Sequence, residues 1–254
     1  MITRYLFVVF LFLNLQSQSQ TKVSLECIDR EFSVLVHVLR DKSLIPVITN
    51  AAITNAIGAL NNAWKPICIQ FKHCETRYVD NYNFMSWNAD SMELEFKSLY
   101  FEPRVINVIV VDNIIVPGGI SGYASLAGIA DRKQPIIVLT SSGGNLVWIH
   151  EFGHYFGLEH TFKAPWGKAN MSDCSTADDG LCDTPPDPNT SSASPNPLLV
   201  GCTYVGNQMD PNGAYYNPLV ENYMSYYGGC RKSFTHQQYE RMVKTYYQDP
   251  KAHF

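Results

Sequence analysis

Beyond its N-terminal twenty residues, the sequence has no apolar run long enough to cross a membrane, since a spanning helix needs roughly 20 consecutive apolar residues. It also has no internal repeat and no cluster of basic residues, although Lys and Arg together number 19. Without such a cluster, a nucleic-acid partner or an anionic membrane surface has no support. These absences indicate a water-soluble globular protein.

The N-terminal residues have the layout of a secretory signal peptide. Arg4 precedes an apolar run from Tyr5 to Leu15, and small polar residues follow this run. The run is too short to span a bilayer. We therefore predict cleavage after Ser17 or Ser19 and a secreted, extracellular protein with no membrane anchor once residues 1–19 are removed. The remaining residues are enough for one large domain or for two tightly packed halves.

The first part of the mature chain reads as a mixture of strands and helices. Strands are predicted where β-branched residues alternate or apolar residues run together, at 32–39, 67–74, 105–112 and 135–140. A short edge strand is expected within residues 119–128. One helix is capped by Thr49 or Asn50, and a second is capped by Asn145 and ends near Phe156.

After His160 the chain changes character. Residues 161–232 show little periodicity and are rich in Pro, Asn, Asp, Ser and Gly, and a helix is then predicted over residues 235–248. An irregular stretch of this length is usually functional or held by cross-links. Two disulfides could supply the cross-links, with the pairing left open among Cys174, Cys182, Cys202 and Cys230. Because the chain has seven cysteines, at least one has no intramolecular partner, and we expect this to be Cys27.

The stretch HEFGHYFGLEH, residues 150–160, contains the residues of a metal site. On a helix, His150 and His154 project from one face, one turn apart, where two imidazoles can hold one ion. Gly157 can take a positive φ, end the helix and turn the chain back, so that His160 supplies a third ligand. Three histidines plus water are typical of a catalytic zinc ion, Zn²⁺.

Glu151 lies beside the metal ligands rather than among them, which is the place of a general base. It would take a proton from a water molecule that the metal has activated for attack on a carbonyl group. A bare H-E-x-x-H also arises by chance on ordinary helices. Gly157 and His160 at fixed offsets favour the metal site, whereas Glu159 is predicted to be a solvated surface residue.

The complete pattern resembles the zinc signature of the metzincin metalloproteases. ENYMSYY, residues 221–227, is similar to the methionine-containing turn of that group. The resemblance implies that Met224 packs beneath the imidazoles without coordinating the metal. It also implies that Tyr226 approaches the metal and stabilises the reaction intermediate.

Within the metzincins, the likeness is strongest to the pappalysin family. The segments that carry it are HTF (160–162), GLCDTPPDP (180–188), FTHQQYERM (234–242) and SGYASLAG (121–128). The resemblance implies an α+β metzincin-like catalytic domain over residues 20–254, with a mixed twisted sheet and an active-site helix. An upper subdomain of about residues 22–157 and a lower subdomain of about residues 158–254 would flank a cleft. A protein or peptide substrate would lie there in extended conformation, paired with the edge strand.

The same resemblance implies a possible second ion, Ca²⁺, in the lower part. Candidate oxygen ligands are Asp173, Asp178, Asp179, Asp183 and Asp187, although their spacing does not follow the EF-hand pattern and capping of turns explains them equally well. Two glycosylation sequons begin at Asn170 and Asn189, and they matter only in a eukaryotic secretory pathway.

The sequence therefore predicts a secreted zinc endopeptidase that hydrolyses peptide bonds with Glu151 as general base. One alternative is a catalytically silent or latent secreted protein that uses the same cleft to bind a partner. The presence of all three histidines and the glutamate argues against it. Another alternative is a non-proteolytic metal hydrolase, against which the methionine turn counts.

Overall fold

The computed structural model describes residues 24–116, 119–125, 134–190 and 196–248. The predicted signal peptide, residues 1–19, lies outside this range. In the described part, no helix is both long and apolar enough to cross a membrane. The helices are α1 (Asn50–Trp64), α2 (Ala89–Tyr100), α3 (Gly144–Tyr155) and α4 (His236–Gln248). The strands are β1 (Arg30–Leu39), β2 (Ile69–Val79), β3 (Ser86–Trp87), β4 (Ile106–Val111), β5 (Asn113–Ile114), β6 (Gly122–Ala124), β7 (Ile136–Thr140), β8 (Leu199–Val200) and β9 (Thr203–Tyr204).

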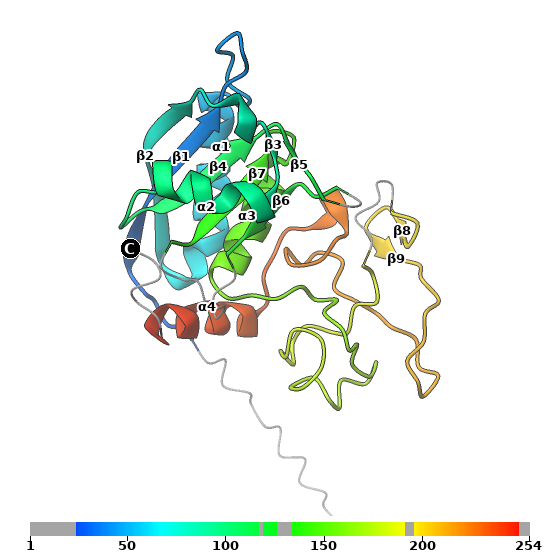
Figure 1. Ribbon diagram of the computed structural model, residues 1–254. Coiled ribbons are helices and arrows are strands. Elements are labelled where there is room, and N and C mark those ends of the chain that lie inside the picture. The colour runs from blue at the N-terminus through cyan, green and yellow to red at the C-terminus, as the bar shows by residue number, and fades with distance from the viewer. Residues whose placement is uncertain (1–23, 117–118, 126–133, 191–195, 249–254) are drawn as a thin grey trace, which may run out of the picture.

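A mixed five-stranded sheet organises the first part of the chain, with strand order β2-β1-β4-β7-β6 (Figure 1). The first four strands in this order are parallel, and β6 pairs with β7 in the antiparallel direction. As expected for a sheet covered on both faces, the central strand β4 is buried along its whole length. The predicted edge strand is confirmed as β6, which forms one border of the sheet.

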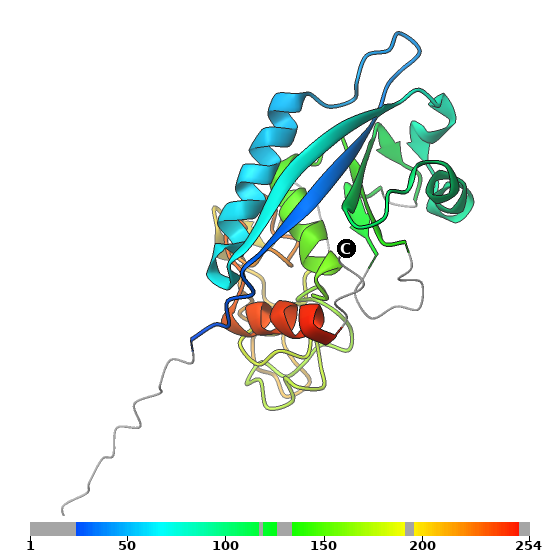
Figure 2. The same cartoon turned by 90° about the vertical axis from the view of Figure 1, so that its left-hand side faces the viewer.

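The two faces of the sheet belong to different hydrophobic clusters. Val108 and Val110 of β4 pack in a cluster with α1, α3 and α4, whereas Ile109 and Val111 face a cluster that contains Phe96 of α2. Figure 2 shows α1 and α3 on one side of the sheet and α2 on the other. This two-sided burial explains the continuous apolar runs of the central strands.

The starts of two helices test the predicted caps. Thr49 caps α1, and its side chain accepts a hydrogen bond from the backbone N–H of Ala52, as the sequence predicts. The predicted cap of α3 is wrong, because α3 begins at Gly144 and Asn145 lies inside the helix. The chain leaves β7 through Gly143 and Gly144, and Gly144 has a φ of +57° that a side chain would disfavour.

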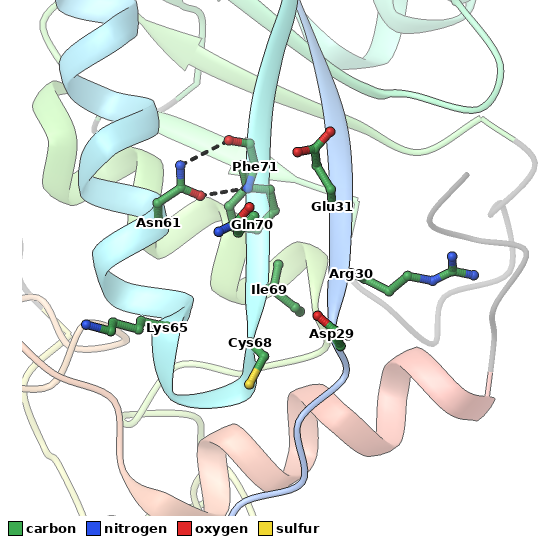
Figure 3. Close-up of a pocket in the computed structure, with 9 residues that line it drawn as sticks. All are labelled: Asp29, Arg30, Glu31, Asn61, Lys65, Cys68, Ile69, Gln70 and Phe71. Atoms are coloured by element: carbon green, nitrogen blue, oxygen red, sulfur yellow. Dashed lines mark hydrogen bonds between the residues drawn. The ribbon is translucent and has the colours of Figure 1, made fainter.

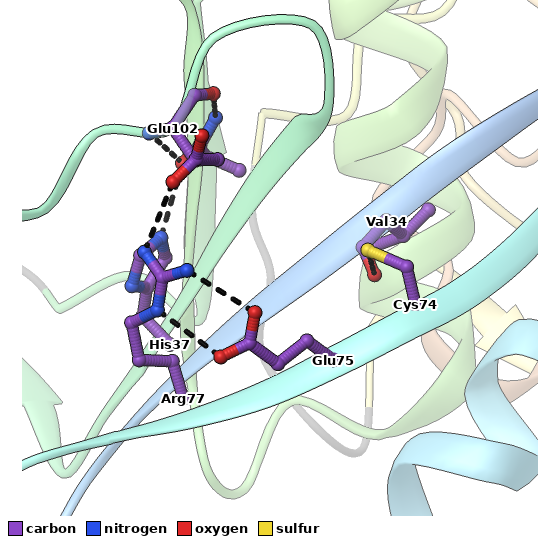
Figure 4. Close-up of polar contacts among 7 residues, drawn as sticks. Val34, His37, Cys74, Glu75, Arg77 and Glu102 are labelled. Atoms are coloured by element: carbon purple, nitrogen blue, oxygen red, sulfur yellow. Dashed lines mark hydrogen bonds and ion pairs between the residues drawn. The ribbon is translucent and has the colours of Figure 1, made fainter.

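The N-terminal cysteine assignment is also wrong. Cys27 forms a disulfide with Cys68, and the free cysteine is Cys74. Cys27 and Cys68 lie just before β1 and β2, which are parallel neighbours, so their Cα atoms are only 5.1 Å apart. Figure 4 shows Cys74 on β2, where its thiol donates to the carbonyl oxygen of Val34, apart from the salt bridges of Arg77.

The outer border of the sheet at β2 is partly blocked by a side chain of α1. The Asn61 amide accepts from the N–H of Phe71 at 2.6 Å and donates to its carbonyl oxygen at 3.0 Å (Figure 3). Both main-chain groups of Phe71 are thereby occupied. A second protein strand could pair here only after displacing Asn61.

After α3 the chain is mostly irregular until α4, as the sequence predicts. Two disulfides cross-link this stretch, Cys174–Cys182 and Cys202–Cys230, which resolves the pairing that the sequence left open. Helix α4 then returns to the first part of the chain, and the hydroxyl of Tyr239 donates to the carbonyl oxygen of Ala63 at 2.8 Å. The division into upper and lower subdomains stays a prediction.

Candidate active site

Helix α3 carries the first residues of the site. Trp148 and Phe152 pack into the core, and this fixes the direction in which the rest of the helix projects. His150 and Glu151 are nevertheless almost fully buried, with 4% and 5% of their surface exposed. Polar groups buried to this degree need partners or a function.

Gly157 ends the helix in the predicted manner. Its φ is +90°, its N–H donates to the carbonyl oxygen of His154, and the N–H of Leu158 donates to that of Gly153. The chain then reverses, so that the carbonyl oxygen of Leu158 accepts from Nδ1 of His154 at 2.7 Å. His160 is brought back beside the helix by this turn.

The three histidines converge through their Nε2 atoms. Nε2 of His160 lies 3.1 Å from that of His150 and 3.0 Å from that of His154. Two nitrogens about 2.0–2.1 Å from one tetrahedral zinc ion would be about 3.3–3.4 Å apart. In the described part of the chain, this is the one cluster of three side chains able to hold a metal ion.

Hydrogen bonds on the far side of two rings fix which nitrogen faces the cluster. Nδ1 of His150 lies 2.7 Å from the carbonyl oxygen of Tyr223, so it carries the proton and donates, and Nδ1 of His154 does the same toward Leu158. Their Nε2 atoms therefore present lone pairs. Burial lowers the pKa of all three imidazoles, that of His160 to about 3. Converging lone pairs on neutral rings repel one another unless a cation lies between them, so the donor set fits a metal ion.

The Glu151 carboxylate lies in a confined place beside this cluster. Burial raises its pKa to about 8, and the positive charge of Arg231 acts in the opposite direction. Gly122 of β6 is its neighbour, because a Cβ at that position would come within 3.0 Å of Cγ of Glu151 and 3.1 Å of Oε1. The glycine thus lets the border strand approach the carboxylate.

Met224 lies against α3 through a contact that sequence reasoning did not identify. It is fully buried, and a Cβ on Gly153 would come within 2.5 Å of its sulfur. Gly153 therefore leaves the space that Met224 fills. A glycine inside a predicted helix was the available signal. The backbone of the turn is held by Asn222, whose Oδ1 accepts from the N–H of Met224 at 2.8 Å.

Tyr226 lies beside the three histidines. Its ring centre is 5.0 Å from that of His160 and 4.4 Å from that of Phe162, which itself stacks on His160 at 4.4 Å. Burial, followed by the charge of Glu151, raises the pKa of its phenol. The structure thus brings together all six residues that the sequence singled out around the metal: His150, Glu151, His154, His160, Met224 and Tyr226.

The five candidate calcium aspartates do not gather in this way. In the described residues, no three of these carboxylates form a cluster that could hold a cation. Asp187 accepts from Thr161 and Tyr227, and Asp183 accepts from the N–H of Gln237. Of the two sequons, Asn170 is exposed and Asn189 is buried.

Comparisons with known proteins agree with this site. Residues 136–246 match the peptidase family described as pregnancy-associated plasma protein-A. An extracellular metalloprotease of Sordaria macrospora is 28% identical over 236 residues, covering 85% of this chain and 74% of its own. One of Neurospora crassa is 29% identical over 214 residues, covering 77% of this chain and 67% of its own.

Among solved structures, mature mirolysin of Tannerella forsythia in complex with a cleaved peptide has a similar fold. Its TM-score is 0.58 at 17% identity, over 85% of this chain and 91% of mirolysin. The predicted metzincin-like α+β fold is thereby confirmed. The protein is therefore a metalloprotease, with a pappalysin-family domain in residues 136–246.

Proposed function

We propose that this protein is a secreted zinc endopeptidase in which His150, His154 and His160 hold the metal and Glu151 is the general base. The observation that carries the proposal is the convergence of three Nε2 atoms, from His150, His154 and His160, beside a buried carboxylate. Zinc is favoured because a three-histidine set is typical of catalytic zinc. Secretion is supported by the predicted signal peptide and by relatives named extracellular metalloproteases.

When bound, zinc supplies a Lewis acid that lowers the pKa of water and polarises a carbonyl group. The side chains of the protein would transfer the protons and stabilise the oxyanion. Glu151 accepts a proton from the attacking water and passes it to the leaving amine. A cation at the three imidazoles would also lower the pKa of Glu151, which restores its basic form at neutral pH. Tyr226 would donate a hydrogen bond to the developing oxyanion.

A peptide substrate would bind in extended conformation along β6. This strand borders the sheet, and Gly122 within it lies directly beside Glu151. An added strand would use the main-chain groups of β6 that face away from β7. Mirolysin, which has a similar fold, is described in complex with a cleaved peptide, and this supports a peptide as the substrate class. The cleft would separate an upper part, about residues 22–157, from a lower part, about residues 158–254.

Glu151→Ala tests the proposal in the mature chain. We expect the variant to keep one equivalent of zinc, measured by mass spectrometry of the native protein, and to cut an unfolded protein about 10²- to 10⁴-fold more slowly. Glu159→Ala is the matched control, because Glu159 pairs with Lys163 at 2.7 Å and lies outside the catalytic cavity. Equal cutting by wild type and Glu151→Ala would contradict the assigned base. A zinc-loaded wild type that cuts nothing would favour the silent binding protein.

Calcium binding in the long loop is proposed on narrower grounds. Three carboxylate oxygens there are buried without a hydrogen-bond partner: Oδ1 of Asp178, Oδ2 of Asp179 and Oδ1 of Asp183. Buried carboxylates usually have donors or a cation nearby. Calorimetric titration of the zinc-loaded protein with calcium tests this proposal. An absence of binding heat would contradict calcium binding in the loop.

A further inference from the structure

A cavity of about 650 Å³ opens beside Glu151. Its walls are the backbone of residues 119–122, one face of α3, and the turn that follows Met224. This size is typical of pockets that receive small ligands or single side chains. Among its described lining residues, Arg231 is charged at neutral pH, Glu151 becomes charged when a cation lowers its pKa, and burial keeps His150 neutral. Arg231 and Glu151 therefore decide which charged groups the cavity accepts.

Arg231 is held in place by main-chain oxygens. Its Nε donates to the carbonyl oxygen of Gly228 at 3.0 Å, and Nη1 lies 3.4 Å and 3.5 Å from the carbonyl oxygens of Tyr223 and Ser225. Burial lowers the pKa of the guanidinium, and Glu151 acts in the opposite direction. Even so, arginine stays charged at any pH at which proteins are folded.

No carboxylate in the described part of the chain forms a salt bridge with Arg231, although the charge of Glu151 acts on it from a greater distance. Every other salt bridge there joins different residues, and the Glu151 carboxylate is not within the 4.0 Å that would make it an ion-pair partner. Nη1 also lies 3.4 Å from Nδ1 of His150. None of these partners is a carboxylate, and the planar fork of a guanidinium carries five N–H donors, so donors remain for a ligand. Such a fork matches a carboxylate in shape and charge. Gly228 also lines the cavity, and a Cβ at that position would meet nothing within 4 Å.

We propose that Arg231 binds the carboxylate of a substrate side chain next to the bond that is cut, so that the enzyme prefers Asp or Glu at that position. This inference rests on the proposed peptidase function and adds the class of substrate to it. A lysine or arginine side chain in the same cavity would meet the like charge of Arg231 and be rejected.

Two measurements test this proposal: the sequences of the cleavage sites, and the ratio of kcat/KM between peptides with Glu and with Gln at one position. The zinc-loaded mature protein cuts an unfolded protein of known sequence, and mass spectrometry identifies the residues on each side of every cut. Peptides that differ only at the selected position, with Glu, Gln or Lys, then give kcat/KM. We expect Glu to exceed Gln by about tenfold or more, as for hydrogen bonds to charged groups. Arg231→Gln should bring the ratio close to one, and Arg231→Glu should favour Lys.

Lys232→Gln is the matched control. It removes the same charge from the adjacent residue, which is exposed, pairs with Glu221 and does not line the cavity. Its Glu-to-Gln ratio should equal that of the wild type. A second readout is the Kd of the Glu and Gln peptides for Glu151→Gln, with and without Arg231→Gln, by fluorescence anisotropy.

The outcomes separate the two proposals. Cutting with no acidic preference overturns the role of Arg231 and leaves the peptidase intact. An Arg231→Gln variant that slows all three peptides by one factor also overturns it, because Arg231 would then act only through Glu151. If the wild type cuts nothing while the Glu peptide binds tighter than the Gln peptide in an Arg231-dependent way, the catalytic proposal fails and the binding preference stands.

Discussion

Gly153 shows how a missing side chain can shape a catalytic centre. A Cβ there would come within 2.5 Å of the Met224 sulfur, in a turn that Asn222 holds in place. We expect Gly153→Ala to lower the free energy of unfolding by about 1–3 kcal/mol, as overpacked cores do. The measurement is the urea midpoint of the zinc-free protein, which separates packing from metal affinity.

Gly58→Ala is the control for this substitution. Gly58 lies inside α1, and a Cβ there would meet nothing within 4 Å. Alanine should therefore stabilise the helix by about 0.5–1 kcal/mol. Two alanine variants of equal stability would show that Met224 moves aside without cost.

Residues whose role depends on local spacing could be predicted, and residues whose role depends on distant contacts could not. The offsets of His150, His154, Gly157 and His160 are set within three helical turns, so the sequence alone places them. Gly153 matters because Met224, about 70 residues later in the chain, packs against it. Arg231 matters because it contacts His150 across a separation of 81 residues. No local pattern encodes such a contact.

Among the elements, α2 was missed while the central strands and the other helices were predicted. Its sequence, ADSMELEFKSLY, buries only Phe96 and Lys97 completely, so its apolar spacing is weak. Its stability comes instead from contacts with Phe84 and Trp87 and from a side-chain cap by Asn88. Tertiary packing overrode a poor local signal.

The link between β1 and β2 gives a second prediction. Replacing Cys27 and Cys68 by Ser should lower the free energy of unfolding by about 2–4 kcal/mol, because the bridge restricts the unfolded chain. Cys74→Ser should change it by less than about 0.5 kcal/mol, since this thiol is exposed. Urea unfolding without reductant measures both. Labelling of a thiol other than Cys74 in the native protein would show that the pairing is different.

For the whole molecule, acidic groups in the long loop make stability depend on pH. Burial raises the pKa of Asp178 to about 7 and that of Asp179 to about 6. With folded-state pKa values above the ordinary 3.8, the folded protein binds more protons than the unfolded chain between these limits. Their contribution to stability is therefore present at low pH and lost as pH rises through the folded values.

The variant Asp178→Asn isolates this effect from that of the histidines. Between pH 4 and 7 the wild type should lose stability relative to Asp178→Asn, measured by urea unfolding in the presence of a chelator. Added calcium should reverse the loss at pH 7 if it binds these carboxylates. A difference between the two proteins that does not vary with pH would contradict the raised pKa of Asp178.

The packing of α4 against the first part of the chain has a consequence for the resistance of the protein to proteolysis. A peptidase of the proposed kind would meet copies of itself, and each copy carries a mostly irregular segment between α3 and α4, described over residues 161–190 and 196–235. Two disulfides and the docking of α4 through Tyr239 keep that segment from straightening. A reducing environment would remove the bridges, and neighbouring molecules could then cleave the segment. If the proposed function holds, we expect reduction of the two bridges to shorten the lifetime of the enzyme before any catalytic residue changes.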